Sequence, residues 1–174
     1  MKRLIPFLFL LLCSITTNAQ TTRPTKEQTI EYIKSFFSDH EVIFYWDSQK
    51  EFIKEADNYI FKASGNQLEI SWDSYGFYSS EKEKREVYVF NISDIEFIEF
   101  VKNNANDVGC VYYLAFHTQN KKQLIKRGDN YVSKMNLQLF RTLNCDIDLS
   151  ELKISKAFNH LRKLSGAPEP IEFN

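Results

Sequence analysis

The residues with the most obvious chemical potential are three histidines, which lie far apart in the 174-residue chain. His160 has Arg162 and Lys163 beside it in the stretch KAFNHLRKLSGAPEP, whereas His40 and His117 stand in unrelated contexts. Histidine acts as a metal ligand or a general base where other ligands or carboxylates converge on it. None of the three belongs to an HxH or HExxH pattern, so their spacing gives no support for a zinc site.

Motifs of other catalytic sites are also missing from the sequence. The chain has no CxxC pair, no GxSxG elbow and no glycine-rich phosphate loop, and it holds five glycines in all. The acidic residues Asp94, Glu96 and Glu99 fit the polar side of one segment, and the run EKEKREV fits a solvated turn. We therefore expect no enzyme activity, no cofactor and no metal. The alternative is a site assembled from distant Ser, His and Asp residues, which spacing cannot reveal.

One aromatic cluster is a candidate contact site for a partner. The stretch WDSYGFYSS places Trp72, Tyr75, Phe77 and Tyr78 around Gly76. If the stretch is a loop, its rings are exposed, and exposed aromatic rings often anchor interfaces. The other interpretation is a strand that continues with its rings turned inward.

Residues 1–19 have the layout of a secretory signal peptide. A basic pair precedes an apolar run of about ten residues, and Thr17 and Ala19 suit cleavage after Ala19. This run is shorter than the roughly 20 residues that span a bilayer. We expect an exported protein, periplasmic or secreted, in which residues 20–174 form a single domain. A retained anchor and a lipoprotein that carries its lipid on Cys13 are the alternatives.

The mature chain gives two further expectations about partners and location. Without the two basic residues of the signal, its net charge moves from −1 to −3, which gives no reason to expect nucleic-acid binding. It has no second long apolar run, so we expect it not to span a membrane. An oxidising compartment allows a disulfide between Cys110 and Cys145, and the alternative is two buried thiols.

Two amphipathic helices are predicted at the ends of the mature chain, over residues 25–38 and 149–165. In the first, Thr25 and Gln28 have the spacing of a capping box. The second has an apolar stripe and ends before Gly166, which suits a left-handed C-cap. The stripe consists of Ile154, Ala157, Phe158, Leu161 and Leu164.

The polar residues of the second predicted helix have a structural explanation. Arg162 and Lys163 fall in its last turn, where the helix dipole favours positive charge. His160 falls at the edge of the apolar stripe, at 100° per residue. We therefore expect a structural or solvent-facing role for His160.

Between the helices, residues 41–144 follow the two-residue period of β-strands. About seven strands are expected, and their connections are too short for helical crossovers, so the sheets are predicted to be antiparallel. Ser64-Gly65-Asn66 predicts one hairpin. Gln119-Asn120 predicts a second, between GCVYYLAFHT and KKQLIKR. The segment DIEFIEFV is predicted as a strand, with a short helix as the alternative. The expected class is α+β.

This element order resembles a pleckstrin-homology-like β-barrel or sandwich, in which a C-terminal helix closes one open end of two sheets. The resemblance covers roughly residues 41–165, with the first helix as an addition. The segments TKEQTIEYI and AFNHLRKLSG also resemble small exported proteins of Bacteroidota. The resemblance implies a single-domain, periplasmic protein and carries over no catalytic residue.

The function expected from these features is a non-catalytic binding or interaction module of the bacterial cell envelope. Its partner is an unknown envelope protein, lipid or glycan. One alternative is an envelope hydrolase, which requires His117 or His160 to be hydrogen-bonded to a carboxylate in a concave pocket. Another is a periplasmic inhibitor or immunity-type protein.

Overall fold

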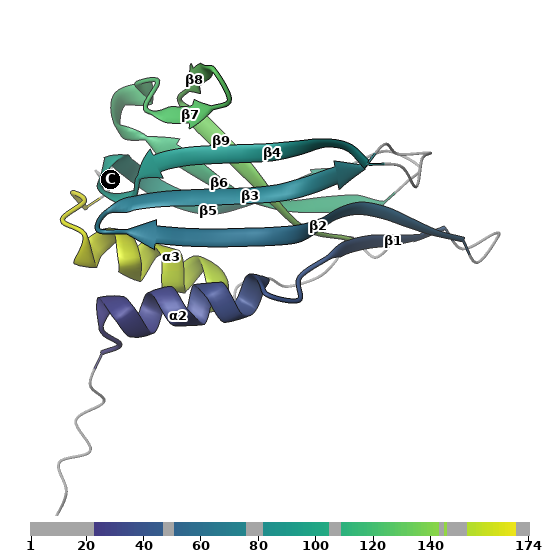
Figure 1. The fold of residues 1–174 in the computed structure, drawn as a ribbon, viewed down its shortest axis with the longest axis horizontal. Coiled ribbons are helices and arrows are strands. Elements are labelled where there is room, and N and C mark those ends of the chain that lie inside the picture. Colours follow the sequence, from purple (N-terminus) through teal and green to yellow (C-terminus); the bar gives the residue numbers. More distant parts are fainter. Residues whose placement is uncertain are drawn as a thin grey trace, which may run out of the picture.

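The structure, a computed structural model, describes residues 23–46, 51–75, 82–104, 109–142, 145 and 153–169. Within these ranges two β-sheets are preceded by one helix and followed by another (Figure 1). The elements are α2 (Lys26–Phe37), β1 (Val42–Trp46), β2 (Glu51–Ser64), β3 (Gln67–Tyr75), β4 (Lys82–Asn91), η1 (Ile92–Asp94), β5 (Ile95–Asn104), β6 (Cys110–Thr118), η3 (Gln119–Lys121), β7 (Ile125–Arg127), β8 (Asn130–Val132), β9 (Lys134–Thr142) and α3 (Lys153–Leu164). The expected signal peptide and Cys13 lie outside the described residues.

The strands form two separate sheets. The larger sheet has the order β1-β2-β3-β4-β7-β8, the smaller has the order β5-β6-β9, and all neighbours are antiparallel. The predicted α+β class with antiparallel sheets is confirmed. Of the predicted barrel or sandwich, two antiparallel sheets with a C-terminal helix packed against them are present. They do not close into a barrel, because no hydrogen-bonded ladder joins the two sheets within the described ranges. Within these ranges, β1 packs beside β9 but does not pair with it.

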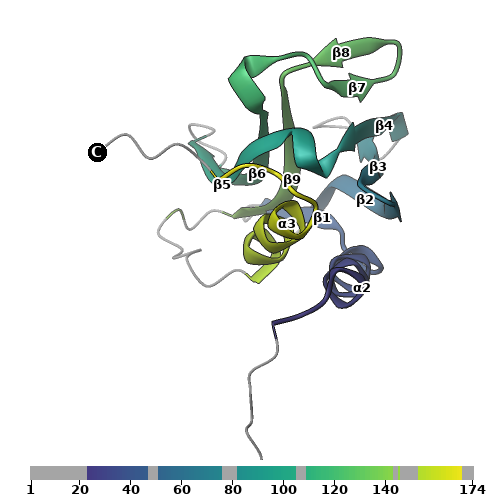
Figure 2. The ribbon, with the colours of Figure 1, turned by 90° about the vertical axis from the view of Figure 1, so that its left-hand side faces the viewer.

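The predicted hairpin across Gln119-Asn120 is wrong. This error explains part of the difference between the expected and the observed number of strands. Asn120 and Lys121 take left-handed φ values of 51° and 55°, which interrupt the chain after β6. The Thr118 hydroxyl donates to the carbonyl oxygens of Lys122 and Ser133, and these bonds connect the end of β6 to the segments before β7 and β9. The chain therefore leaves the smaller sheet and joins β4 through β7. With the short β7–β8 hairpin (Figure 2), the described residues contain nine strands where about seven were expected.

The N-terminus of α2 is fixed by the predicted capping box. Thr25 Oγ1 accepts from the Gln28 backbone N–H at 3.2 Å, and Gln28 Oε1 accepts from the Thr25 N–H at 2.9 Å. These bonds satisfy two amide groups that a helix start leaves without partners. The same helix buries Ile33 and Phe37 against the sheets.

The two helices and both sheets share one apolar core. Phe158 of α3 is fully buried, and its ring centroid lies 6.3 Å from Phe37, 5.9 Å from Phe61 and 5.0 Å from Phe116. These three partners come from α2, β2 and β6. Figure 2 shows α3 between α2 and the smaller sheet, where it packs on β5. One side chain of α3 thus connects the elements that surround it.

The C-terminal end of α3 differs from the prediction in two side chains. Gly166 has φ +81°, which confirms the predicted left-handed C-cap. Its N–H donates to Lys163 O at 3.1 Å. Leu164, expected in the apolar stripe, is 43% exposed, whereas Arg162 is only 1% exposed. The Arg162 guanidinium donates to the carbonyl oxygens of Ile95 and Pro168. Burial lowers its pKa from the ordinary value, against the nearby charges of Glu169 and Glu96.

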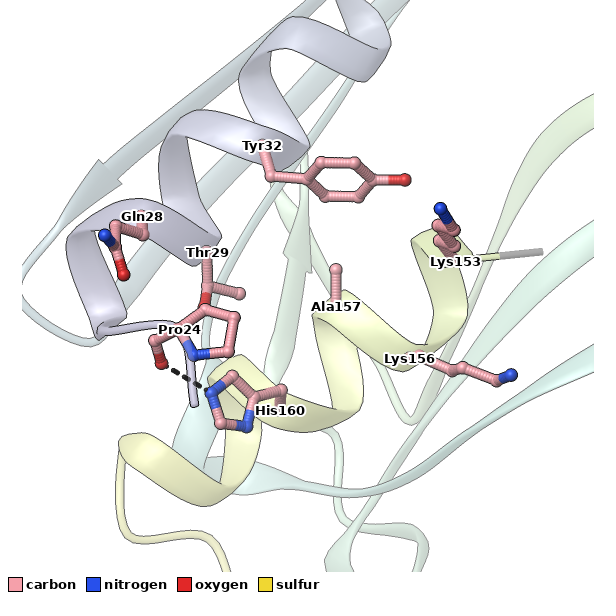
Figure 3. A pocket seen from close by; sticks show the side chains of 8 residues that line it. All are labelled: Pro24, Gln28, Thr29, Tyr32, Lys153, Lys156, Ala157 and His160. Carbon is pink, nitrogen blue, oxygen red and sulfur yellow. Dashed lines mark hydrogen bonds between the residues drawn. The ribbon is translucent and has the colours of Figure 1, made fainter. Parts of the chain in front are cut away.

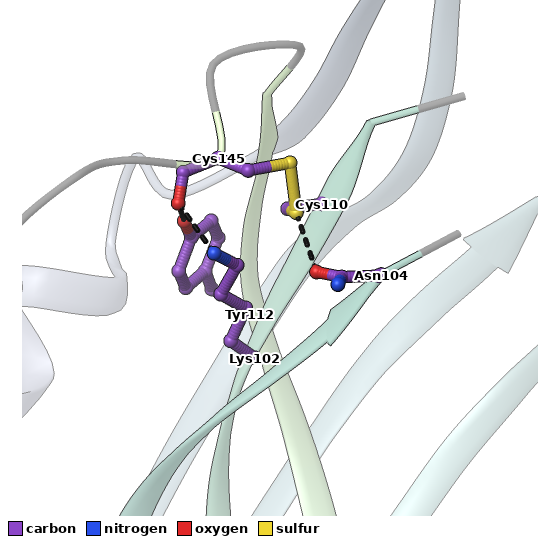
Figure 4. Close-up of a disulfide and its surroundings, with 5 residues drawn as sticks. All are labelled: Lys102, Asn104, Cys110, Tyr112 and Cys145. Atoms are coloured by element: carbon purple, nitrogen blue, oxygen red, sulfur yellow. Dashed lines mark hydrogen bonds between the residues drawn. A yellow bond between two sulfur atoms is a disulfide. The ribbon is translucent and has the colours of Figure 1, made fainter. Parts of the chain in front are cut away.

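A disulfide joins Cys110 at the start of β6 to Cys145, which precedes α3 (Figure 4). Of the two alternatives for these cysteines, a disulfide or two buried thiols, the structure shows the disulfide. The Cys145 carbonyl oxygen accepts from Lys102 Nζ at 2.6 Å and from the Tyr112 hydroxyl at 3.0 Å. Closing a loop of 35 residues stabilises the folded state by about 3–4 kcal/mol. The chain ahead of α3 is thereby fastened to the smaller sheet.

Candidate functional site

A groove of about 620 Å³ lies between α2 and α3 (Figure 3). Small-molecule sites in proteins commonly have volumes of roughly 300–1,000 Å³. One wall comes from α2 and the residues before it, and the other comes from α3. The described lining residues are Pro24, Gln28, Thr29, Tyr32, Lys153, Lys156, Ala157 and His160.

The groove is open because small side chains lie where the two helices approach each other. Thr29 is buried, and its hydroxyl donates to the Thr25 carbonyl oxygen at 2.7 Å, so no unpaired polar group is left there. Ala157 faces it from α3 (Figure 3). Elsewhere along the same two helices, the rings of Phe37 and Phe158 lie 6.3 Å apart in the apolar core.

Tyr32 is the aromatic residue among the described lining residues on the α2 side. It is 39% exposed, and few large apolar side chains in the described ranges are as open to solvent. In Figure 3 its ring extends from α2 across the groove, with the hydroxyl directed toward Lys153. A half-exposed aromatic ring of this kind offers apolar contact area at low entropy cost.

The α3 wall carries two lysines that have no ion-pair partner among the described residues. Lys153 and Lys156 are exposed, and neither forms an ion pair with any residue that the structure describes. No carboxylate occurs among the described residues that line the groove. Among these described lining residues, charge attraction to an anionic group comes from the two lysines.

His160 closes the groove at the end away from the two lysines. Its Nε2 lies 2.7 Å from the Pro24 carbonyl oxygen. Because a carbonyl can only accept, Nε2 carries a proton and is the donor. The bond connects α3 to the residues before α2, which agrees with the structural role predicted for His160. It also places the imidazole in the lining of the groove.

The three histidines lie apart and have different partners. His40 packs among the rings of Phe36, Phe37 and Tyr59, and its burial lowers the pKa of the imidazole. His117 lies on the smaller sheet, with Nε2 2.9 Å from Glu99 Oε1 and its ring stacked on Phe97 at 4.3 Å. Within the described ranges, no cluster of three or more His, Cys, Asp or Glu residues is arranged to hold a metal ion.

The predicted aromatic contact cluster does not form one exposed surface in the described residues. Trp72 is only 6% exposed and is stacked between Tyr59 and Tyr88, at centroid distances of 5.8 Å and 5.3 Å. Tyr75 is half-buried, and its hydroxyl donates to Asp57 Oδ1 at 2.9 Å. Trp72 is therefore a buried strand residue, and Tyr75 is the last residue of β3. The inward-facing alternative, which concerned Tyr75 and Phe77 together, stays a prediction.

The other two members of that cluster, Phe77 and Tyr78, lie outside the described residues. Their part of the prediction stays a prediction.

A buried polar cluster that the sequence did not indicate joins the two sheets. Glu55 of β2 accepts from Arg141 of β9 through both oxygens, at 2.8 Å from Nη2 and 3.1 Å from Nε. Gln138 Nε2 donates to the same carboxylate, and the Tyr59 hydroxyl donates to Gln138 O at 3.0 Å. Burial, with the charge of Glu55 beside it, raises the pKa of Tyr59 and keeps its hydroxyl protonated. The cluster is structural, since its polar groups bond to one another.

A second polar cluster lies around Asp73 on the larger sheet. Its carboxylate accepts from Arg85 Nη1 at 2.7 Å, from Lys82 Nζ at 2.9 Å and from Asn58 Nδ2 at 3.1 Å. Burial alone raises the pKa of this carboxyl, but the hydrogen bonds from Lys82, Arg85 and Asn58 outweigh it and lower the pKa to about 2. These basic side chains are committed to neighbouring strands.

Sequence reasoning missed the groove because it treated α2 and α3 separately. The available signal was the spacing of Lys153, Lys156, Ala157 and His160, which repeats at three and four residues and defines a second face of α3. That face adjoins the apolar stripe already recognised. Which residues of α2 this face packs against depends on the tertiary structure, and the spacing of residues within α3 gives no information about that.

Comparison of the chain with protein-family models, with curated proteins and with solved structures gives no match in any of the three. None of the helices in the described ranges is long and apolar enough to cross a membrane.

Proposed function

We propose that the protein is an exported, non-catalytic binding module of the cell envelope whose ligand occupies the α2–α3 groove. The observation that carries the proposal is the groove itself. It combines a ligand-sized volume, an exposed ring at Tyr32 and two lysines without ion-pair partners among the described residues. Pockets with apolar walls and a few converging polar groups are the usual form of a ligand site.

Two features support the location. Residues 1–19 have the layout of a signal peptide, and the Cys110–Cys145 disulfide is a bond that persists in oxidising compartments outside the cytoplasm. Both observations point to the same side of the membrane.

The proposal is tested with an envelope extract of the native host and three forms of the protein. Each form is incubated with increasing amounts of extract, and bound small molecules are detected by native mass spectrometry. The forms are the wild type, Tyr32→Ala and Tyr131→Ala. Tyr131 is the matched control, because it is a tyrosine of β8 that is 54% exposed and does not line the groove.

We expect a saturable bound species in the wild type and in Tyr131→Ala, and its loss in Tyr32→Ala. Absence of any saturable species, or equal retention of that species by all three forms, would show that the groove is not a binding site.

A second candidate function rests on the His117–Glu99 pair. A carboxylate at 2.9 Å from an imidazole meets one of the two conditions of the hydrolase alternative, which also requires a concave pocket around the pair. The His117 side chain is 22% exposed and the Glu99 side chain 49% exposed, so the pair lies at the surface and not in the groove. Hydrolysis of a panel of ester, peptide and glycoside substrates that disappears in His117→Ala would favour this function over the binding module.

A further inference from the structure

We infer that the open edge of β4 is a docking site for an extended peptide segment of another protein, which adds to the larger sheet as a further strand. This inference goes beyond the proposed function, because the surface concerned shares no described lining residue with the α2–α3 groove. Three observations support it: unpaired main chain in β4, a cavity beside that main chain, and basic side chains that are engaged elsewhere.

β4 is paired along its length on one side but only near one end on the other. Its register with β3 runs from Lys82 to Asn91, whereas its register with β7 consists of Tyr88 and Val89. In the part of the chain that the structure describes, no strand pairs with residues 82–87 on the β7 side. Figure 1 shows β7 beside the C-terminal part of β4. The N-terminal part of β4 is therefore a sheet edge.

The main-chain groups of Arg85 and Val87 point to this edge. The Ser74 hydroxyl of β3 donates to Lys84 O at 3.3 Å, which places the Lys84 carbonyl on the β3 side. Main-chain groups alternate between the two sides of an antiparallel strand, so those of Arg85 and Val87 lie on the opposite side. Val89, which is in register with β7, follows the same alternation. A strand placed at this edge can therefore pair with both residues.

A cavity of about 520 Å³ lies along the same edge. Its described lining consists of residues 84–87 of β4, residues 127–130, where β7 turns into β8, and Val132. Successive side chains of a strand point to opposite faces. A cavity that touches the four consecutive residues 84–87 therefore lies beside the strand and not over one face. The open main chain borders space that a peptide can enter.

The basic side chains of this edge are engaged with carboxylates of β3 and β4. Lysines and arginines on an edge strand commonly discourage pairing with other chains. Here Arg85 Nη1 donates to Asp73 of β3 at 2.7 Å, and Lys82 Nζ lies 2.9 Å from the same carboxylate. Lys84 Nζ lies 2.7 Å from Glu86 of its own strand. Arg85 and Lys82 thus extend across β3, away from the open side of β4.

An extended peptide is the ligand whose chemistry matches this edge. N–H donors and C=O acceptors occur along it at the spacing of a strand, and a second extended main chain presents the same groups in complementary order. A hydrocarbon chain forms no hydrogen bond with them. An anion accepts from N–H groups but cannot donate to carbonyl oxygens. Peptides that bind in this way gain affinity mainly from main-chain hydrogen bonds.

A second copy of this chain does not suit the edge. Two copies of one strand pair antiparallel about a twofold axis, and residues that lie opposite each other have their main-chain groups in the same phase. One residue then lies opposite its own copy. Residues 82–86 are all charged, so an axis at any of them sets like charges opposite each other, which destabilises the pair. An axis at Val87 would require the residues that β7 already pairs.

The probe is a peptide selected for this edge. A displayed library of linear peptides of about eight residues, the length of an ordinary strand, is selected on the wild-type protein and depleted on Val87→Pro. Proline removes the N–H that points to the edge. The most enriched peptide is synthesised with blocked ends, and its dissociation constant for the wild type is measured by fluorescence anisotropy. We expect saturable binding at one site.

Main-chain recognition is tested with two N-methylated forms of this peptide. One form is methylated at every odd position and the other at every even position. Only every second N–H of a paired strand faces its neighbour. We expect one form to bind about tenfold or more weakly than the unmodified peptide and the other to bind as well as it does. This measurement uses the wild-type protein and so does not depend on the folding of a variant.

The location is tested with variants of the protein. Val87→Pro should bind the peptide about tenfold or more weakly than the wild type. The matched control is Tyr131→Pro, which places a proline in β8, a strand at the end of the larger sheet that does not line this cavity. Tyr131→Pro and Tyr32→Ala should both bind the peptide as the wild type does.

Four results would overturn the inference. They are the absence of any peptide that survives the selection, equal binding of the two N-methylated forms, loss of the peptide in Tyr32→Ala, and dimerisation of the wild type that Val87→Pro abolishes. The third result would place the peptide in the α2–α3 groove, and the fourth would make a second copy the occupant. The species bound from envelope extract is assayed separately with Tyr32→Ala, so failure of this inference and failure of the proposed function are distinguishable.

Discussion

Basic side chains behave differently at the groove and on the larger sheet. Lys82 and Arg85 both bind Asp73, within 2.9 Å, and thereby hold neighbouring strands together. Lys153 and Lys156 bind no carboxylate in the part of the chain that the structure describes. The residue types are similar, but their partners are not. The charges on the sheet join neighbouring strands, whereas the groove lysines have no carboxylate partner in the described part of the chain.

The two regions also differ in what holds them together. The helical end relies on apolar packing around Phe158, with a groove above it. Between the sheets, the buried pair of Glu55 and Arg141 is part of the contact. A buried ion pair is costly to break but adds little net stability over a well-packed apolar pair. Stability measurements on the two regions should therefore give different patterns.

The largest effect is expected from Phe158→Ala, which removes the ring that α2, β2 and β6 share. Loss of a fully buried phenylalanine costs about 3–5 kcal/mol in the free energy of unfolding. Denaturant unfolding checks this value. His160→Ala, two positions along the same helix, removes one hydrogen bond and should cost only about 0.5–1.5 kcal/mol. The reverse ranking would mean that the helical end is not held by apolar packing.

The next effect concerns the ion pair between the sheets. Glu55→Ala removes the carboxylate that Arg141 binds, while the guanidinium stays buried. The variant should lower the free energy of unfolding by about 3 kcal/mol. The double variant Glu55→Leu/Arg141→Met should lose less than Glu55→Ala alone, because the charge is removed with its partner. Urea unfolding of both variants decides the point. A larger loss in the double variant would show that the pair itself stabilises the fold.

A smaller change in the free energy of unfolding is expected when the pH is lowered. The folded-state pKa of Asp73, about 2, lies below the ordinary aspartate value, so its bonds stabilise the protein fully above the unfolded pKa. This contribution is lost as the pH falls from about 4 toward 2 and the carboxyl takes up a proton. Asp73→Asn should cost about 1 kcal/mol at pH 7 and make stability less dependent on pH in that window. An unchanged pH profile would show that the Asp73 bonds contribute nothing.

The smallest effect is expected at the groove lysines. Lys153→Ala and Lys156→Ala should each change the free energy of unfolding by less than about 0.5 kcal/mol, because the exposed side chains make no ion pairs with described residues. Arg85→Ala, which removes the bonds to Asp73 and Ser71, is the matched comparison and should cost more. Thermal melts of the three variants are sufficient. Equal losses would remove the distinction between the two sets of charges.

The parts of the fold that the sequence predicted correctly depend on residues close together in the chain. The capping box joins Thr25 to Gln28, and Gly166 ends α3 two residues after its last helical position. The turn at Ser64-Gly65-Asn66 joins β2 to β3, with Gly65 at φ +61°. Each of these signals acts within one turn of backbone, so composition and order are enough to predict it.

The parts that the sequence did not predict depend on distant residues. Arg141 and Glu55 are 86 positions apart, and their contact requires that β2 and β9 belong to different sheets that face each other. The barrel or sandwich was predicted from the order of elements, which does not say which strands pair. Arg162 is an intermediate case. It follows Phe158 by four residues and so shares its face, but its charge led to an assignment at the solvent-exposed helix end.

The contact between α2 and α3 joins two segments that translation produces at different times. Pro24 and His160, which form one end of the groove, are 136 positions apart, so a growing chain carries the first wall long before the second. Until α3 has emerged, the ring of Phe37 lacks the neighbouring ring of Phe158. A chain that stops before Lys153 has one wall of the groove and an uncovered apolar core. The groove therefore has both of its walls only in a chain translated and folded through α3.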